Sequence, residues 1–209
     1  MSKTLEQHLR ASLSQTSDVA PRPLSNIELP LKLGNLLTRS LLKSLKPAAV
    51  LVPVVRRRSG LTVLLTRRAE HLRSHKGQIS FPGGRRDEGD VSIAGNALRE
   101  AQEEVGLHAR HVEVIGYLDD YPTVTRYLVT PVVGIVSGSP KLAADASEVA
   151  EIFEVPLEFV LNLANYERKV FSRGGFNVPF FELNHGSYRI WGATAGMLWN
   201  LAQKAAAHG

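Results

Sequence analysis

The sequence predicts an α/β sandwich, in which helices cover a mixed β-sheet. Short apolar segments rich in β-branched residues recur between positions 48 and 192, as expected of strands. Two segments with the apolar spacing of a helix, 92–105 and 193–207, lie among and after them. Strands mixed with one strong internal helix and a terminal one favour this fold class. A length of 209 residues suits one domain with an attachment.

The composition is ordinary for a globular protein, with 44% hydrophobic and 22% charged residues. The chain contains no cysteine, which excludes disulfides and thiolate metal sites and suits a reducing compartment. No apolar run has the length that spans a bilayer, and the N-terminal segment has no apolar signal core. We therefore expect a cytoplasmic protein that does not bind membranes.

The net charge is +5, and its excess is concentrated between positions 50 and 86. One acid, Glu70, stands there against these basic residues: Arg56, Arg57, Arg58, Arg67, Arg68, Arg73, Lys76, Arg85 and Arg86. Such a segment attracts polyanions. Because the chain shows no nucleic-acid motif and no interleaved aromatic residues, we expect a small phosphorylated ligand and no nucleic acid. For the Arg56–Arg58 triplet alone, a charged hairpin turn is the favoured interpretation.

The first elements are expected in this order. Residues 3–15 form a short helix, after which Pro21, Pro23 and Pro30 interrupt the pattern. We assign residues 1–46 to an N-terminal extension and residues 47–209 to the domain. Within the domain we expect a hairpin and a short strand that ends at Pro82-Gly83-Gly84, at positions 48–55, 61–66 and 77–81.

The later elements follow the internal helix. Strands are expected at 112–118 and 127–136, and Pro131 inside the second suggests a bulge or a sheet edge. A helix is expected at 156–164. Three more strands and the terminal helix complete the chain, at 168–172, 177–183, 188–192 and 193–207.

The internal helix carries the most informative pattern. Asp90 or Ser92 can cap its start, and Gly106 can end it in a left-handed conformation. At about 100° per residue, one stripe of the helix is apolar and faces the core. The stripe contains Ala94, Leu98, Ala101 and Val105, with Ala97 at its border.

Three glutamates lie beside that stripe. With Glu100 set at 0°, Glu103 falls at about −60° and Glu104 at about +40°. Like charges at this spacing repel one another, and a divalent cation would reverse the sign of the interaction. Carboxylates without a nearby Cys or His suit a hard cation such as Mg²⁺ or Mn²⁺. Taken alone, however, the pattern is more often an exposed acidic face.

The segment "GGRRDEGDVSIAGNALREAQEEVGL", residues 83–107, resembles the Nudix box. The core of that box matches Arg99, Glu100, Glu103, Glu104, Gly106 and Leu107, with Ala101 as a small aliphatic residue. Two features depart from the general pattern. Asp90 stands where the box has a glutamate, and eight residues instead of seven separate it from Arg99.

The segment upstream resembles the motif of the coenzyme A pyrophosphatase branch of the Nudix hydrolase superfamily. The matching residues are Leu64, Leu65, Thr66, Arg68, Leu72, Arg73, His75, Gly77, Phe81, Pro82, Gly83, Gly84, Asp87, Asp90 and Ser92. Ala69 replaces a serine and Ile79 a valine. Together the two motifs cover residues 64–107 without a gap, which makes a mere acidic face a poor explanation of the glutamates.

The resemblance implies a Nudix-type α/β/α sandwich with a mixed β-sheet, acting as a monomer or homodimer. It implies a diphosphatase that uses magnesium or manganese to cleave coenzyme A or acyl-CoA into 3′,5′-ADP and (acyl-)4′-phosphopantetheine. Two alternatives remain open. One is a broader Nudix hydrolase of ADP-ribose or other nucleoside diphosphate derivatives, and the other is a non-catalytic nucleotide-sensing domain.

The resemblance also implies roles for individual residues. Glu100 and Glu104 are the expected main metal ligands, and Glu103 is a third ligand or the general base. Arg99 would orient these carboxylates or Asp90. Glu148, on a later loop, is an alternative base, although simple exposure would explain it equally well.

Substrate binding is expected from the upstream motif. Arg68, Arg73 and His75 are candidates for the substrate phosphates, including a 3′-phosphate, because arginine suits bidentate phosphate binding. For His75 the sequence favours a packing role and a phosphate contact equally. Gly83 and Gly84 would let the backbone adopt unusual conformations beside the metal site.

Overall fold

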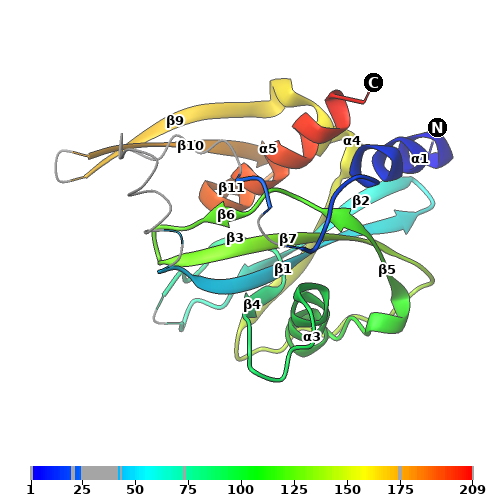
Figure 1. The fold of residues 1–209 in the computed structure, drawn as a ribbon, viewed down its shortest axis with the longest axis horizontal. Helices are drawn as coiled ribbons and strands as arrows, with labels where there is room; N and C mark the ends of the chain where they lie inside the picture. The colour runs from blue at the N-terminus through cyan, green and yellow to red at the C-terminus, as the bar shows by residue number, and fades with distance from the viewer. Residues whose placement is uncertain are drawn as a thin grey trace.

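The protein is an α/β sandwich in which a mixed main sheet lies between helices (Figure 1), as predicted. The computed structural model describes residues 2–19, 22–24, 42, 44–72, 74–173 and 176–208. Helix α3 (Ile93–Val105) covers one face of the sheet. Of the described elements, three helices and a second sheet lie on the other face. The helices are α1 (Ser2–Leu13), α4 (Leu157–Leu161) and α5 (Gly192–Ala206).

In the described part of the chain, the main sheet has eight strands. They run in the order β3-β2-β1-β7-β5, with β4 added to β1, β6 to β7 and β8 to β2. The central pair β1–β7 is parallel and the other pairs are antiparallel. Their bounds are β1 Lys46–Arg57, β2 Gly60–Arg68, β3 Ile79–Ser80, β4 Gly83–Arg85, β5 Val112–Tyr117, β6 Tyr121–Pro122, β7 Tyr127–Val136 and β8 Val149–Pro156.

The three late strands form a separate antiparallel sheet, which the sequence did not distinguish from the main one. Its order is β11-β10-β9, and its strands are β9 Tyr166–Arg173, β10 Phe176–His185 and β11 Tyr188–Trp191. The helix expected at 156–164 is shorter than predicted. It consists of α4 followed by a 3₁₀ turn, Leu163–Asn165. The side chain of Asn162 caps the start of this turn. A further 3₁₀ turn, Ala109–His111, precedes β5.

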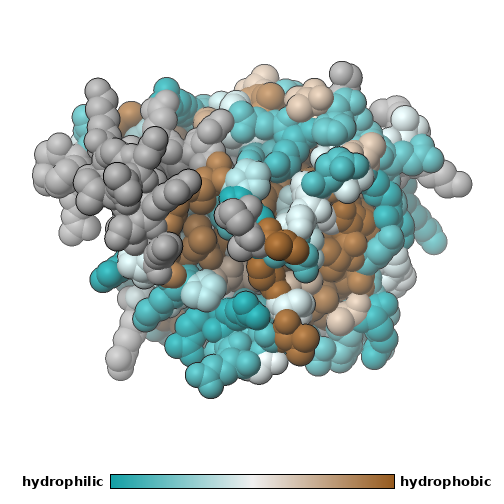
Figure 2. Space-filling model, viewed as in Figure 1, coloured by the Kyte–Doolittle hydropathy of each residue, from teal (hydrophilic) through white to brown (hydrophobic). Residues whose placement is uncertain are grey.

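The core has two layers because β1 is buried on both faces. Ala49, Leu51 and Val55 pack against α3, whereas Val52 and Val54 pack toward α1 and α5. This explains why the strand is apolar without alternation. Figure 2 shows hydrophobic residues along the middle of the same view and mostly hydrophilic residues over the lower edge, where α3 and its loops lie.

The described part of the N-terminal segment packs on the domain. Leu9 and Leu13 of α1 are fully buried in the larger core layer. Arg22 forms a buried ion pair with Asp120, at 2.8 Å between Nε and Oδ1, and Leu24 forms a β-bridge with Asp120. The division at residue 46 stays a prediction, but α1 contributes to the same core as the strands.

Pro131 lies on a central strand, so the predicted sheet edge is wrong. Its carbonyl accepts a hydrogen bond from Leu118 N–H at 2.9 Å. On that side β5 ends at Tyr117 and β6 begins at Tyr121. The nitrogen of Pro131, which carries no hydrogen to donate, therefore faces the break between these two strands. The register shift of the β5–β7 pair lies nearer the end of β7, between Val114 and Gly116 of β5.

The strand expected to stop at Pro82-Gly83-Gly84 does stop, but the chain at once starts β4. Gly83 pairs with Val50 and Arg85 with Ala48. A Cβ on Gly83 would lie 2.5 Å from the carbonyl oxygen of Ala49, at a φ of +156°. The glycine therefore allows β4 to approach β1, which places the next residues beside α3. None of the described helices is long and apolar enough to cross a membrane.

Candidate active site

Helix α3 has well-defined ends, which set the positions of its glutamates. Ser92 caps the start, with its Oγ accepting a hydrogen bond from Gly95 N–H at 2.9 Å. Gly106 ends the helix with a φ of 68°, as predicted. Asp90, the other predicted cap, has a different role, because its carboxylate accepts hydrogen bonds from Asp87 N–H and Arg99.

The buried face of α3 centres on Ala97, Ala101 and Val105, which are fully buried. Ala94 and Leu98 are only half-buried. Ala97, predicted at the border of the apolar stripe, is therefore at its centre, and Glu104 and Glu100 beside it turn toward the sheet. Their exposure increases around the helix: Glu104 is 5% exposed, and the side chains of Glu100 and Glu103 are 17% and 59% exposed.

Glu104 is an acid in an unfavourable electrostatic environment. Burial raises its pKa to about 8, and the negative charges of Glu148 and Glu100 add to the rise. The charge of Arg68 and a hydrogen bond from Gly83 N–H act in the opposite direction. Burial likewise raises the pKa of Glu100, against the charge of Arg99. A bound cation would relieve the repulsion and favour the charged form of both groups.

Glu148 reaches this cluster through a chain of backbone hydrogen bonds. Asp145 N–H donates to the Glu104 carbonyl at 2.9 Å, and Glu148 N–H donates to the Asp145 carbonyl at 2.9 Å. The Glu148 carbonyl in turn accepts from Ala69 N–H at 2.8 Å. The loop is thus attached to the end of α3 and to the end of β2. As a result the Glu148 carboxylate lies close enough to Glu104 and Glu100 to raise the pKa of both.

Gly84 brings the backbone of β4 against the Glu100 carboxylate. A Cβ at this position would lie 2.5 Å from Glu100 Oε2. Because real Cβ atoms do not approach so closely, a larger residue would displace the carboxylate. The two glycines therefore act differently: Gly83 makes room for β1, and Gly84 makes room for Glu100.

Arg99 connects the acidic groups on its side of the helix. Its guanidinium donates to both oxygens of Asp90, at 3.0 and 3.1 Å, and to Glu100 and Glu103, at 2.9 Å each. The arginine lowers the pKa of the Asp90 carboxyl. Asp90 is shorter than the glutamate of the Nudix box, and one extra residue separates it from Arg99. The two side chains nevertheless form a bidentate pair.

The predicted substrate residues have different positions. Arg68, at the end of β2, is close enough to Glu104 to lower its pKa, and its buried Nε has no hydrogen-bond partner among the described residues. His75 has a φ of 56°, and its Nδ1 lies 2.8 Å from Gln78 Oε1. This contact lies within the 75–78 turn. Arg73 lies outside the described residues.

Asn96 belongs to the site region but was missed. It is fully buried, its Nδ2 donates to the Arg85 carbonyl at 3.3 Å, and its Oδ1 has no partner in the described part of the chain. On the helical projection Asn96 lies at about −40°, between Glu100 and Glu103. A polar residue inside the arc of the glutamates was the available signal.

The donor set fits a hard divalent cation, because it consists of carboxylate oxygens beside a glycine backbone. Glu100, Glu104 and Glu148 could hold such an ion, with Glu103 at the rim. Within the described ranges, no three acidic or histidine side chains already converge as a metal-binding group. Arg99 binds one oxygen each of Glu100 and Glu103, so ion binding requires these two side chains to adjust.

Known proteins resemble this chain in the same region. The model of the NUDIX domain matches residues 45–173. The uncharacterized Nudix hydrolase NudL of Citrobacter koseri is 46% identical over 158 residues, which are 75% of this chain and 81% of that protein. NudL of Escherichia coli O7:K1 is 45% identical over the same shares. Among solved structures, the Nudix hydrolase RenU of M. smegmatis has a TM-score of 0.48 and 21% identity, over 78% of this chain and 87% of its own.

The raised pKa of Glu104 predicts how stability depends on pH in the metal-free protein. Between the ordinary glutamate pKa of 4.5 and about 8, the folded protein retains a proton that the unfolded chain releases. The free energy of unfolding should therefore fall as pH rises through this range. Urea unfolding with a chelator present, at intervals from pH 5 to 8.5, measures the effect.

Glu104→Gln should remove this part of the pH dependence, because an amide does not titrate. Glu158→Gln, at an exposed position of α4, is the matched control and should behave as wild type. Equal slopes in wild type and Glu104→Gln would show that burial of Glu104 does not favour its proton.

Proposed function

The chain belongs to the Nudix hydrolase family, and we propose that it is the enzyme that cleaves coenzyme A or acyl-CoA into 3′,5′-ADP and (acyl-)4′-phosphopantetheine. The observation that carries hydrolysis is the buried Glu104 beside Glu100 and Glu148, next to Gly83 and Gly84. The uninterrupted motif of residues 64–92 supports the substrate. A location in the cytoplasm and a monomeric or homodimeric state are part of the proposal.

In this proposal Glu100 and Glu104 are the main ligands of magnesium or manganese, with Glu103 or Glu148 completing the set. When bound, the ion supplies the positive charge that lets a diphosphate approach glutamates. Arg68, beside Glu104, adds a fixed cation for the diphosphate oxygens. Arg99 is a positioning residue, because it holds Glu100, Glu103 and Asp90.

The general base takes a proton from the attacking water as the water oxygen bonds to one phosphorus of the diphosphate. The bond between that phosphorus and the bridging oxygen breaks. The other half leaves with that oxygen, so each product carries one phosphate of the diphosphate. Glu148 is the better candidate for the base. The Glu103 carboxylate already accepts a hydrogen bond from Arg99 at 2.9 Å, and its side chain is 59% exposed.

The direct test is incubation with coenzyme A and magnesium or manganese, with the products separated by charge. We expect 3′,5′-ADP in amounts well above a metal-free control, and loss of turnover in Glu104→Gln without loss of the fold. The absence of 3′,5′-ADP from coenzyme A would reject this substrate. Cleavage of ADP-ribose instead would favour a broader Nudix hydrolase. Nucleotide binding without any turnover would favour a sensing domain.

Gly84→Ala tests the contact between β4 and Glu100. The added methyl group would meet Glu100 Oε2 at 2.5 Å, so the carboxylate must move. Displacement of a catalytic group by about 1 Å can cost about 10²-fold in rate, and we expect a fall of that order in kcat/KM.

The matched control for that variant is Gly89→Ala in the loop between β4 and α3, where an added Cβ meets no atom within 4 Å. It should leave kcat/KM close to the wild-type value. Similar activity of the two variants would mean that the position of Glu100 is not critical.

A further inference from the structure

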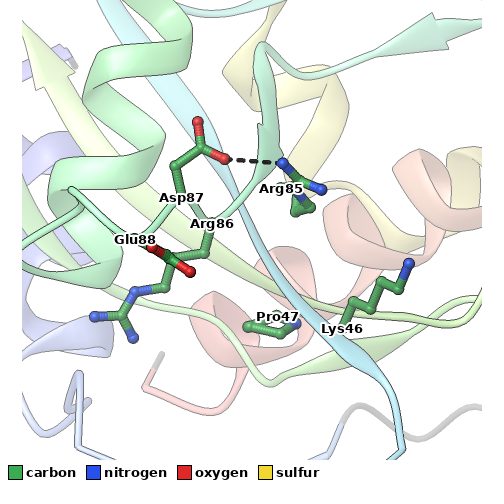
Figure 3. Close-up of a pocket in the computed structure, with 6 residues that line it drawn as sticks. All are labelled: Lys46, Pro47, Arg85, Arg86, Asp87 and Glu88. Carbon is green, nitrogen blue, oxygen red and sulfur yellow. Dashed lines mark hydrogen bonds and ion pairs between the residues drawn. The ribbon is translucent and has the colours of Figure 1, made fainter.

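A pocket of about 350 Å³ lies next to the glutamate site. Its walls are Lys46 and Pro47 at the start of β1 and residues 85–88, at the end of β4 and in the loop before α3 (Figure 3). Three of the six lining residues are cations, Lys46, Arg85 and Arg86, and two are acids, Asp87 and Glu88. Two of the cations, Arg85 and Arg86, belong to the basic excess of the sequence that the proposed function leaves unexplained.

The cations of this pocket are available to a ligand. Arg85 pairs with Asp87 at 3.2 Å, but the two side chains are 64% and 54% exposed, and such pairs contribute little. Arg86 donates to the backbone carbonyl of Asp90 at 3.2 Å. The ammonium of Lys46 forms no ion pair with any residue that the structure describes. An incoming dianion would therefore compete with the weak Arg85–Asp87 pair, and Glu88 is the other acid of the lining.

The pocket is also attached to the glutamate site. The Arg85 carbonyl accepts hydrogen bonds from Asn96 Nδ2 at 3.3 Å and Arg99 Nη2 at 3.4 Å. Asp87 lies between the two arginines, 3.2 Å from Arg85 and 3.8 Å from Arg99. The residue before Arg85 is Gly84, which packs on Glu100. The groups that hold the glutamates thus also position one wall of the pocket.

The opposite wall is fixed by the sheet. Lys46 N–H donates to the Arg126 carbonyl at 2.9 Å, and Lys46 pairs with Tyr127 at the first position of the parallel β1–β7 ladder. Both cationic walls therefore start from backbone that is hydrogen-bonded in the sheet. When a ligand binds, this backbone is already ordered, and the side chains of Lys46 and Arg85 are the parts that lose conformational freedom.

We propose that this pocket binds the phosphate monoester that the substrate carries in addition to its diphosphate. The inference rests on the proposed function, and it separates two phosphate sites. In the proposed function Arg68 acts at the diphosphate, because it lies close enough to Glu104 for its charge to lower the pKa of that carboxyl. His75 already contacts Gln78. Lys46 and Arg85 are then the cations that recognise the third phosphate.

The test compares the affinities of 3′,5′-ADP and 5′-AMP for the full-length protein by isothermal titration calorimetry. The two nucleotides differ only in the 3′-phosphate. We expect wild type to bind 3′,5′-ADP about tenfold more tightly, as for one or two charge-assisted hydrogen bonds. Lys46→Gln and Arg85→Gln should each reduce this ratio several-fold, and the double variant should bring it close to one.

Arg58→Gln is the matched control, because it removes the same charge at the exposed turn of the β1–β2 hairpin. It should keep the wild-type ratio, which separates a local contact from net charge. Equal affinities in wild type, or a ratio unchanged in the double variant, would overturn the assignment.

Because this measurement needs no turnover, it distinguishes the two proposals. If the protein prefers 3′,5′-ADP through Lys46 and Arg85 but does not cleave coenzyme A, the pocket assignment stands and the proposed function is rejected. If it cleaves coenzyme A without this preference, the proposed function stands and the pocket assignment is rejected.

Discussion

Glu104 is a carboxylate that the fold buries next to two others, and most features of the site follow from the cost of that arrangement. Desolvation and the charges of Glu148 and Glu100 favour its protonated form. The compensation comes from Arg68 and from the Gly83 N–H, neither of which lies on the same element as Glu104. Cationic ligands are the simplest further compensation, and Mg²⁺ or Mn²⁺ suits the oxygen donors.

The fold places these groups through a few close approaches. The caps of α3 fix its ends, and the small residues Ala97 and Ala101 let the helix lie close to the sheet. Gly83 lets β4 pair with β1, and Gly84 leaves room for Glu100. The loop before β8 is attached to both α3 and β2 by backbone hydrogen bonds. The acidic groups therefore stay together although their mutual repulsion would separate them.

Local patterns in the sequence predicted the parts that depend on local geometry. The helix, its Ser92 and Gly106 ends and the arc of glutamates follow from a fixed angle per residue. The environment of Glu148 and the pairing of β4 with β1 depend on contacts between distant segments, and the period of a helix or strand carries no information on them. Pro131 illustrates the same limit, because a gap between β5 and β6 accommodates it inside the sheet. The prediction placed Ala97 at the border of the apolar stripe. In the structure α3 turns its smallest side chains, Ala97 and Ala101, toward the sheet.

The most direct test of the central claim is a titration of the full-length protein with Mn²⁺, followed by the loss of the electron paramagnetic resonance signal of the free ion. If the buried carboxylates form the metal site, wild type should bind Mn²⁺, and Glu104→Gln should bind it at least about tenfold more weakly, since a charged ligand is lost. Glu158→Gln, which removes an exposed charge, should bind as wild type does. Equal Mn²⁺ affinity in wild type and Glu104→Gln would contradict the claim.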